Sequence, residues 1–250
     1  MSRRVNRRPA ERYLAGMRPM SLWRHEARRA GLGALLAPLV AAVGLAAVAI
    51  DGAVRLDQAS KSTALVLQSL LELALPLAAG MGAANLVGRD PAIELQLTLP
   101  TAYRATVLRR LVVTAGWVAV IALTTAAYMV ASGWWHRWPE AQPALVGQLT
   151  WLAPTLCMAG FGLLAGAVSG SPAVASAVVA SLWLFEYAAA DLLQEHRWSR
   201  LLYLFATTRG TVDQDWSANR LTLIAAGVAM TAAGWLLLRR PSRLLTKEAE

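Results

Sequence analysis

Six stretches of the chain are long and apolar enough to cross a lipid bilayer, and they constrain the fold more than any other feature of the sequence. A membrane-crossing helix needs about 20 mostly apolar residues. Runs of that kind extend over residues 32–50, 63–87, 107–130, 145–168, 173–190 and 221–238. Strands of a membrane β-barrel would instead be segments of about ten residues with alternating hydrophobicity, a pattern that the sequence lacks. We therefore predict an all-α, polytopic membrane protein with six transmembrane helices.

The composition excludes several other classes of protein. The chain of 250 residues is 56% hydrophobic and only 16% charged, whereas soluble domains carry about 25% charged residues. This balance excludes a disordered chain and a coiled coil, and it argues against an ordinary water-soluble enzyme. The single cysteine, Cys157, cannot form a disulfide within the chain.

The basic residues predict the orientation in the membrane. Nine arginines lie within the first 29 residues, directly before the first apolar run, where they can meet anionic headgroups. An arm that binds nucleic acid is the competing interpretation of this segment, and we predict no nucleic-acid partner. The segments on the side of the N-terminus carry 17 Lys and Arg, against seven on the other side. Because basic loops stay inside, we predict a multi-pass protein of the plasma membrane with both termini in the cytoplasm.

Three regions follow from this layout. Residues 1–30 are predicted to form a basic cytoplasmic tail with an amphipathic interfacial helix, residues 31–240 the transmembrane domain, and residues 241–250 a second cytoplasmic tail. The outer segment 191–220 is longer than a simple hairpin and contains the mixed stretch WSRLLYLFATTRG. We expect it to form a short helix that lies in the outer interface or enters the membrane part-way.

Two carboxylates interrupt the predicted spans, at Glu72 and Glu186. Ionisable residues inside a span are costly and mark functional positions by default, so both are candidates for the path of a substrate. Glu186 lies about one turn from the outer end of its span, where a plain interfacial position is the simpler interpretation. Small residues also repeat every four positions at Gly162, Gly166 and Gly170, and we expect a packing face internal to the bundle.

The sequence contains no recognisable catalytic or metal-binding motif. It lacks the G-x-x-x-x-G-K-[ST] pattern that cradles phosphates, as well as H-E-x-x-H and C-x-x-C. Its three histidines are scattered. We therefore predict no catalytic residue, no metal and no cofactor in this chain.

The predicted cytoplasmic loop after the second span combines apolar residues, an acidic residue and a basic return into the membrane. It reads GRDPAIELQLTLPTAYRATVLRRLVV from Gly88. A helical core would place Ile93, Leu97 and Pro100 on one side, with Glu94 beside them, before a basic return into the membrane.

This loop resembles the loop of type-2 ATP-binding-cassette (ABC) transporter permeases, in which an acidic residue and leucines precede a Leu-Pro step and a basic re-entry. The matching residues are Glu94, Leu95, Leu97, Leu99, Pro100, Thr101, Arg104, Arg109 and Leu111. The basic amphipathic N-terminus, the six spans and the long outer segment before the sixth are also similar. In that family the outer segment forms partly re-entrant helices, and the loop after the second span docks on the ATPase.

The resemblance implies a permease subunit rather than an enzyme. It would form a homo- or heterodimer with a second permease subunit and recruit two copies of a cytoplasmic ATPase, which bind the ATP and Mg. The expected coupling residues are Ile93, Glu94, Leu97, Leu99, Pro100, Thr101, Tyr103 and Arg104. The apolar spans favour export of a small hydrophobic or amphipathic molecule. The alternatives are a secondary transporter that works without ATP and a membrane-embedded enzyme.

Overall fold

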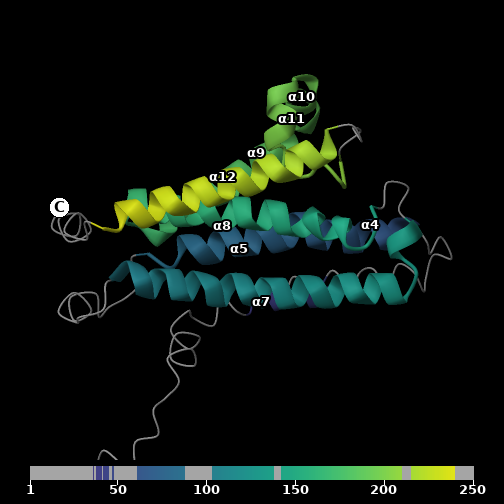
Figure 1. Ribbon diagram of the computed structural model, residues 1–250, viewed down its shortest axis with the longest axis horizontal. Coiled ribbons are helices and arrows are strands. Elements are labelled where there is room, and N and C mark those ends of the chain that lie inside the picture. Colours follow the sequence, from purple (N-terminus) through teal and green to yellow (C-terminus); the bar gives the residue numbers. More distant parts are fainter. Residues whose placement is uncertain are drawn as a thin grey trace, which may run out of the picture.

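The computed structural model describes residues 61–87, 103–137, 142–209 and 215–239, with a few helical positions between residues 36 and 47, and these residues form a bundle of helices (Figure 1). The second apolar run folds as α4 (Lys61–Ser69), a π-helical turn η1 (Leu70–Ala74) and α5 (Leu75–Ala84). The elements that follow are α7 (Tyr103–Ala131), the 3-10 turns η2 (Trp135–Arg137) and η3 (Val146–Gln148), α8 (Leu149–Ser169), α9 (Pro172–Ala188), α10 (Ala190–Glu195), α11 (Arg197–Leu202) and α12 (Trp216–Leu237).

Among the described residues, four helical stretches are long and apolar enough to cross a membrane: Thr63–Ala84, Tyr103–Ala131, Val146–Ser169 and Trp216–Leu237. They correspond to the second, third, fourth and sixth predicted spans. The fifth is present as α9, an apolar helix of 17 residues, which at 1.5 Å per residue is about 25 Å long, shorter than the roughly 30 Å hydrocarbon core of a bilayer. Most of the first predicted span lies outside the described residues. The prediction of six spans is therefore supported for four, and these give the chain the helices of a multi-pass membrane protein.

Helix α8 lies at the centre of the bundle, with α12 along one side and α5 along the other (Figure 1). Glycines let these backbones approach closely. A Cβ at Gly162 would meet the carbonyl oxygen of Gly80 on α5, and one at Gly160 would meet that of Gly227 on α12. The predicted internal packing face is thus confirmed at Gly162 and also at Gly166, which faces α5.

Gly170 does not belong to that packing face. It ends α8 in the left-handed conformation, with φ of 65°, which a residue without a Cβ adopts at little cost. Ser171 then caps α9 by accepting a hydrogen bond from the backbone N–H of Val174. Helix α9 therefore turns back on α8 directly, over the four residues between the predicted spans 145–168 and 173–190.

The predicted outer helical segment is present as two short helices rather than one. Helices α10 and α11 project from the bundle at the end where α12 begins (Figure 1). The chain then turns at residues 203–209 and packs back against α5 and α9, burying Tyr203, Leu204 and Phe205. We call residues 190–209 the return segment.

The predicted amphipathic helix within residues 1–30, the tail at 241–250 and most of the predicted coupling loop lie outside the described residues. Ile93, Glu94, Leu97, Leu99, Pro100 and Thr101 are among the positions not described. Of the predicted coupling residues, Tyr103 and Arg104 open α7, where Tyr103 is buried.

Candidate functional site

A buried ion pair joins the second apolar run to the last helix of the bundle. Arg220, one turn into α12, donates from Nη2 to Oε1 of Glu72 in the π-helical turn. Both side chains have no exposed surface. An isolated charge in an apolar interior is very costly, so buried charges are normally paired. The two residues are 148 positions apart in the sequence, and their pairing fixes α12 against η1.

The same pair holds the return segment. The backbone N–H groups of Thr207 and Thr208 donate to the two carboxylate oxygens of Glu72, at 2.8 and 2.6 Å. Arg220 donates from Nη1 to the carbonyl oxygen of Leu204 at 3.2 Å and from Nη2 to Oγ1 of Thr207 at 2.8 Å. Hydrogen bonds to ionised groups are about twice as strong as neutral ones. Both members of the ion pair therefore hold the turn at 203–209, and we call Glu72 and Arg220 the clamp.

Glu186 on α9 provides a third anchor for the same turn. Its Oε2 accepts a hydrogen bond of 2.8 Å from the backbone N–H of Leu204. Phe205, the next residue, packs edge-to-face against the rings of Trp183 and Tyr203, with centroids 5.7 Å away in both cases. The return segment is thus bound to η1, α9 and α12 by both polar and aromatic contacts.

A proline follows the π-helical turn that carries Glu72. Pro76 has no backbone N–H to donate to the carbonyl of Glu72, and the N–H of Leu75 bonds to the carbonyl of Leu70, five residues back. The carbonyl of Leu73 accepts a hydrogen bond of 3.1 Å from the indole of Trp183 on α9. Such turns are rare and frequently lie at functional sites.

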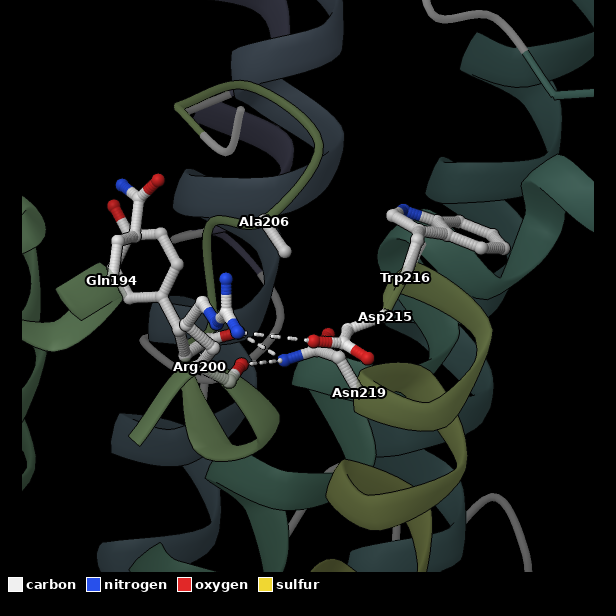
Figure 2. A pocket seen from close by; sticks show the side chains of 7 residues that line it. Gln194, Arg200, Ala206, Asp215, Trp216 and Asn219 are labelled. Atoms are coloured by element: carbon white, nitrogen blue, oxygen red, sulfur yellow. Dashed lines mark hydrogen bonds and ion pairs between the residues drawn. The ribbon is translucent and has the colours of Figure 1, made fainter. Parts of the chain in front are cut away.

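A small pocket lies beside the clamp, between the return segment and the start of α12 (Figure 2). Arg200 and Asp215 form an ion pair of 3.3 Å at its floor. Asn219 donates from Nδ2 to the carbonyl oxygens of Arg200 and Tyr203, at 2.7 and 2.9 Å. Burial raises the pKa of the Tyr203 phenol, so this ring stays neutral. Trp216 links the pocket to the clamp by donating from its indole to Oγ1 of Thr207 at 3.0 Å.

The size of this pocket limits what it can bind. Its volume of about 20 Å³ is room for one water molecule. Sites for drug-sized ligands measure about 300–1,000 Å³. The pocket is therefore too small for the hydrophobic cargo expected from the sequence.

The structure brings the two predicted candidates for a substrate path, Glu72 and Glu186, to one segment of the chain. Both carboxylates accept hydrogen bonds from backbone N–H groups of residues 204–208. Their role in a substrate path stays a prediction. Arg104, the predicted coupling residue at the other end of the bundle, lies over the ring of Trp235, with its guanidinium carbon 4.5 Å from the centroid.

Sequence reasoning missed the cation of this site. Arg220 was predicted to lie in the outer loop, because hydropathy places the start of the sixth span at residue 221, whereas α12 begins at Trp216. A signal was nevertheless present. A carboxylate within an apolar run requires a partner, and Arg220 directly precedes another apolar run.

The chemistry open to this cluster is that of binding and positioning. In the part of the chain that the structure describes, no group of three His, Cys, Asp or Glu side chains could hold a metal ion. The carboxylates and the guanidinium of the clamp are already engaged with backbone groups. The arrangement therefore fits a structural joint between helices better than a reaction centre.

The fold and the clamp together define a class: a multi-pass helical membrane protein whose return segment is fastened inside the bundle by buried charges. Comparisons with protein-family models, with curated proteins and with solved structures gave no match to the chain. The described residues thus form an all-α fold with four helices able to cross a membrane.

Proposed function

We propose that the chain is the transmembrane permease subunit of a type-2 ABC transporter, which pairs with a second permease subunit and exports a small hydrophobic or amphipathic molecule. ATP and Mg would be bound by two copies of a separate cytoplasmic ATPase. One observation supports this proposal above the others. Residues 190–209 form two short helices and a turn that packs back into the bundle between α9 and α12, as the resemblance implies for the outer segment.

The clamp offers a mechanical route between the two ends of the bundle. Glu72 lies in the middle of the stretch Thr63–Ala84, and the loop with the leucines follows the end of α5. A force applied to that loop would displace α5 and, through Glu72, the turn at Thr207 and Thr208. Chains of packed and hydrogen-bonded elements of this kind can carry energetic coupling between distant sites. The ATPase would thereby act on the return segment without touching it.

A secondary transporter without an ATPase is the second candidate, and the buried ion pair favours it. Ionisable groups inside spans frequently mark ion and proton pathways. Such a protein would transport substrate in liposomes when it is the only protein present. The two candidates therefore make opposite predictions for the isolated chain.

The decisive experiment introduces a charge into the predicted docking loop. Leu97→Asp is expected to weaken capture of the ATPase by at least about tenfold, because burial of a leucine contributes roughly 1.5–3 kcal/mol and an unpaired carboxylate adds a desolvation cost. Leu145→Asp is the matched control, since it adds the same charge at an exposed leucine outside the loop. Co-purification from native membranes measures binding, and vesicle assays measure ATP-driven transport.

Two results would count against the proposal. Normal capture and normal transport by Leu97→Asp, at normal abundance in the membrane, would remove the coupling role of the loop. Transport by the purified chain without ATP or any partner would instead support the secondary transporter.

A further inference from the structure

An apolar groove runs along the bundle between α7 and α12, with α8 as its floor. It has a volume of about 400 Å³, within the range of about 300–1,000 Å³ that is typical of ligand sites. The lining side chains are almost all apolar and include Leu108, Val112, Ala115, Ala159, Ala232 and Trp235. Val112 is half exposed, so the groove is open along its side.

Two arginines meet at one end of this groove. The guanidinium carbons of Arg104 and Arg239 lie 4.5 and 4.9 Å from the centroid of the Trp235 ring, and that ring is part of the groove wall. Arg239 is exposed and Arg104 is partly exposed. The groove therefore ends at the ring of Trp235, beside which lie two positively charged guanidinium groups.

The other charges described at this end of the bundle are also positive. Arg109 is one of them, on the second turn of α7, whereas Arg110 is buried and engaged in another interaction. The carboxylates of the described ranges lie elsewhere, in the π-helical turn or in and around the return segment, at Glu72, Glu186, Asp191, Glu195 and Asp215. Within those ranges, neither Arg104 nor Arg239 forms an ion pair with a carboxylate. An anion at this position would thus meet attraction from several sides.

The length of the groove matches half of a bilayer. Ala115 and Arg104 are separated by 11 positions on α7, which is about 16 Å at 1.5 Å per residue. One leaflet contributes about half of the roughly 30 Å hydrocarbon core. An extended acyl chain with its headgroup beside the arginines would therefore occupy the groove along its length.

A second copy of the chain fits this groove less well. In a two-fold dimer the same patch of both subunits meets itself, and an axis along the membrane normal would bring both pairs of Arg104 and Arg239 to the same level. Four guanidinium groups would then share one apolar contact. A ligand with one anionic group and one long apolar chain has no such cost.

We propose that the groove between α7, α8 and α12 binds one acyl chain of an anionic phospholipid, whose phosphate lies against Arg104 and Arg239. The acyl chain packs on Leu108, Val112 and Ala232, and the phosphate accepts hydrogen bonds from the guanidinium groups. Arg is suited to this contact, because its planar fork matches the geometry of a phosphate. The site does not depend on the permease proposal, since it needs only a chain embedded in a membrane.

The test uses the full chain in lipid nanodiscs that contain phosphatidylglycerol or phosphatidylcholine, each with a photoactivatable group on the acyl chain. Cross-linked peptides are identified by mass spectrometry. We expect phosphatidylglycerol to label the groove residues of α7 and α12, with a clear preference over phosphatidylcholine. Arg104→Gln combined with Arg239→Gln is expected to reduce that preference about thirtyfold, given the usual contribution of each arginine near anionic lipid.

A second set of variants tests the acyl-chain site separately from the charges. Ala232→Trp fills the groove and is expected to abolish the labelling of α7. The matched control is Ala127→Trp, an exposed alanine of α7 outside the groove, which is expected to leave labelling unchanged. A thermal melt of each variant confirms that the bundle is folded.

Three results would overturn the inference. The first is equal labelling by the two lipids in the unchanged chain, and the second is full labelling of the groove in Ala232→Trp. The third is a cross-link from the groove to residues 32–50 or to another copy of the chain, which would make the groove a contact between helices. None of these results would affect the capture of the ATPase through Leu97.

Discussion

Removal of the guanidinium from the clamp is the sharpest test of the structure. In Arg220→Met the unbranched side chain keeps most of the volume, but Glu72 stays buried with a negative charge and no cation. Breaking a buried pair by removing one partner costs about 3–5 kcal/mol. We expect about 3 kcal/mol, the lower end of that range, because an unfolded chain in a membrane also finds polar partners.

A double-mutant cycle isolates the interaction from the loss of the side chain itself. In a Glu72→Gln background the buried Arg220 is itself a charge without a counter-ion, so Arg220→Met removes that charge together with the hydrogen bonds to Leu204 and Thr207, and it should cost about 0 kcal/mol. The expected coupling energy is therefore about 3 kcal/mol. The free energy of unfolding is measured for the unchanged protein, the two single variants and the double variant. Each is unfolded by sodium dodecyl sulfate in mixed micelles and followed through the fluorescence of the ten tryptophans.

The ion pair of Arg200 and Asp215, in the same region, is the control for the buried pair of Glu72 and Arg220. Arg200 and Asp215 lie 3.3 Å apart, but their side chains are 28% and 22% exposed. A partly exposed pair of this kind contributes about 0–1 kcal/mol. If Arg220→Met and Glu72→Gln are additive to within about 0.5 kcal/mol, as for independent sites, the clamp does not stabilise the protein in the way we argue.

Three further predictions follow from the structure and the sequence. Gly162→Val should lower the free energy of unfolding by about 3 kcal/mol, because its side chain would enter the backbone of α5; Gly116→Val, with nothing within 4 Å, is the control, and equal effects would contradict the packing. A reporter that is active only outside the membrane should be inactive when fused after Glu250; strong activity there would reverse the orientation. Glu72→Gln should reduce transport more than Glu186→Gln, since Glu72 accepts hydrogen bonds from three residues and Glu186 from one; equal and negligible effects would leave both as tolerated carboxylates.

Hydropathy located the helices well because the burial of apolar runs is a local property of the sequence. The predicted stretch 63–87 is observed as Thr63–Ala84, and 145–168 as Val146–Ser169. It failed at the start of α12, which begins five residues before the prediction, at Trp216. Arg220 is compatible with the apolar interior only because Glu72 lies opposite to it, and such a pairing between distant segments is invisible to a sliding window.

The candidate site was predictable in part. The carboxylates of Glu72 and Glu186 stand out in apolar runs, and the outer segment was expected to be helical. Their convergence on residues 204–208 depends on the way α9 and α12 pack around the π-helical turn. The cation and the backbone donors come from a segment more than 130 residues away from Glu72, so no local pattern could assign them.

The order of synthesis gives the clamp a further consequence. Arg220 is made 148 residues after Glu72. At about 5–20 residues per second, Glu72 is therefore synthesised roughly 7–30 s before the cation that pairs with it. During that interval the leucines around Glu72 must offset an insertion cost of about 2.5–3.5 kcal/mol. Only the arrival of the last helix closes the clamp on the return segment. A chain that stops before α12 would keep a stranded carboxylate in the bilayer, and we expect membrane proteases to remove it, so that the ion pair acts as a checkpoint for the synthesis of α12.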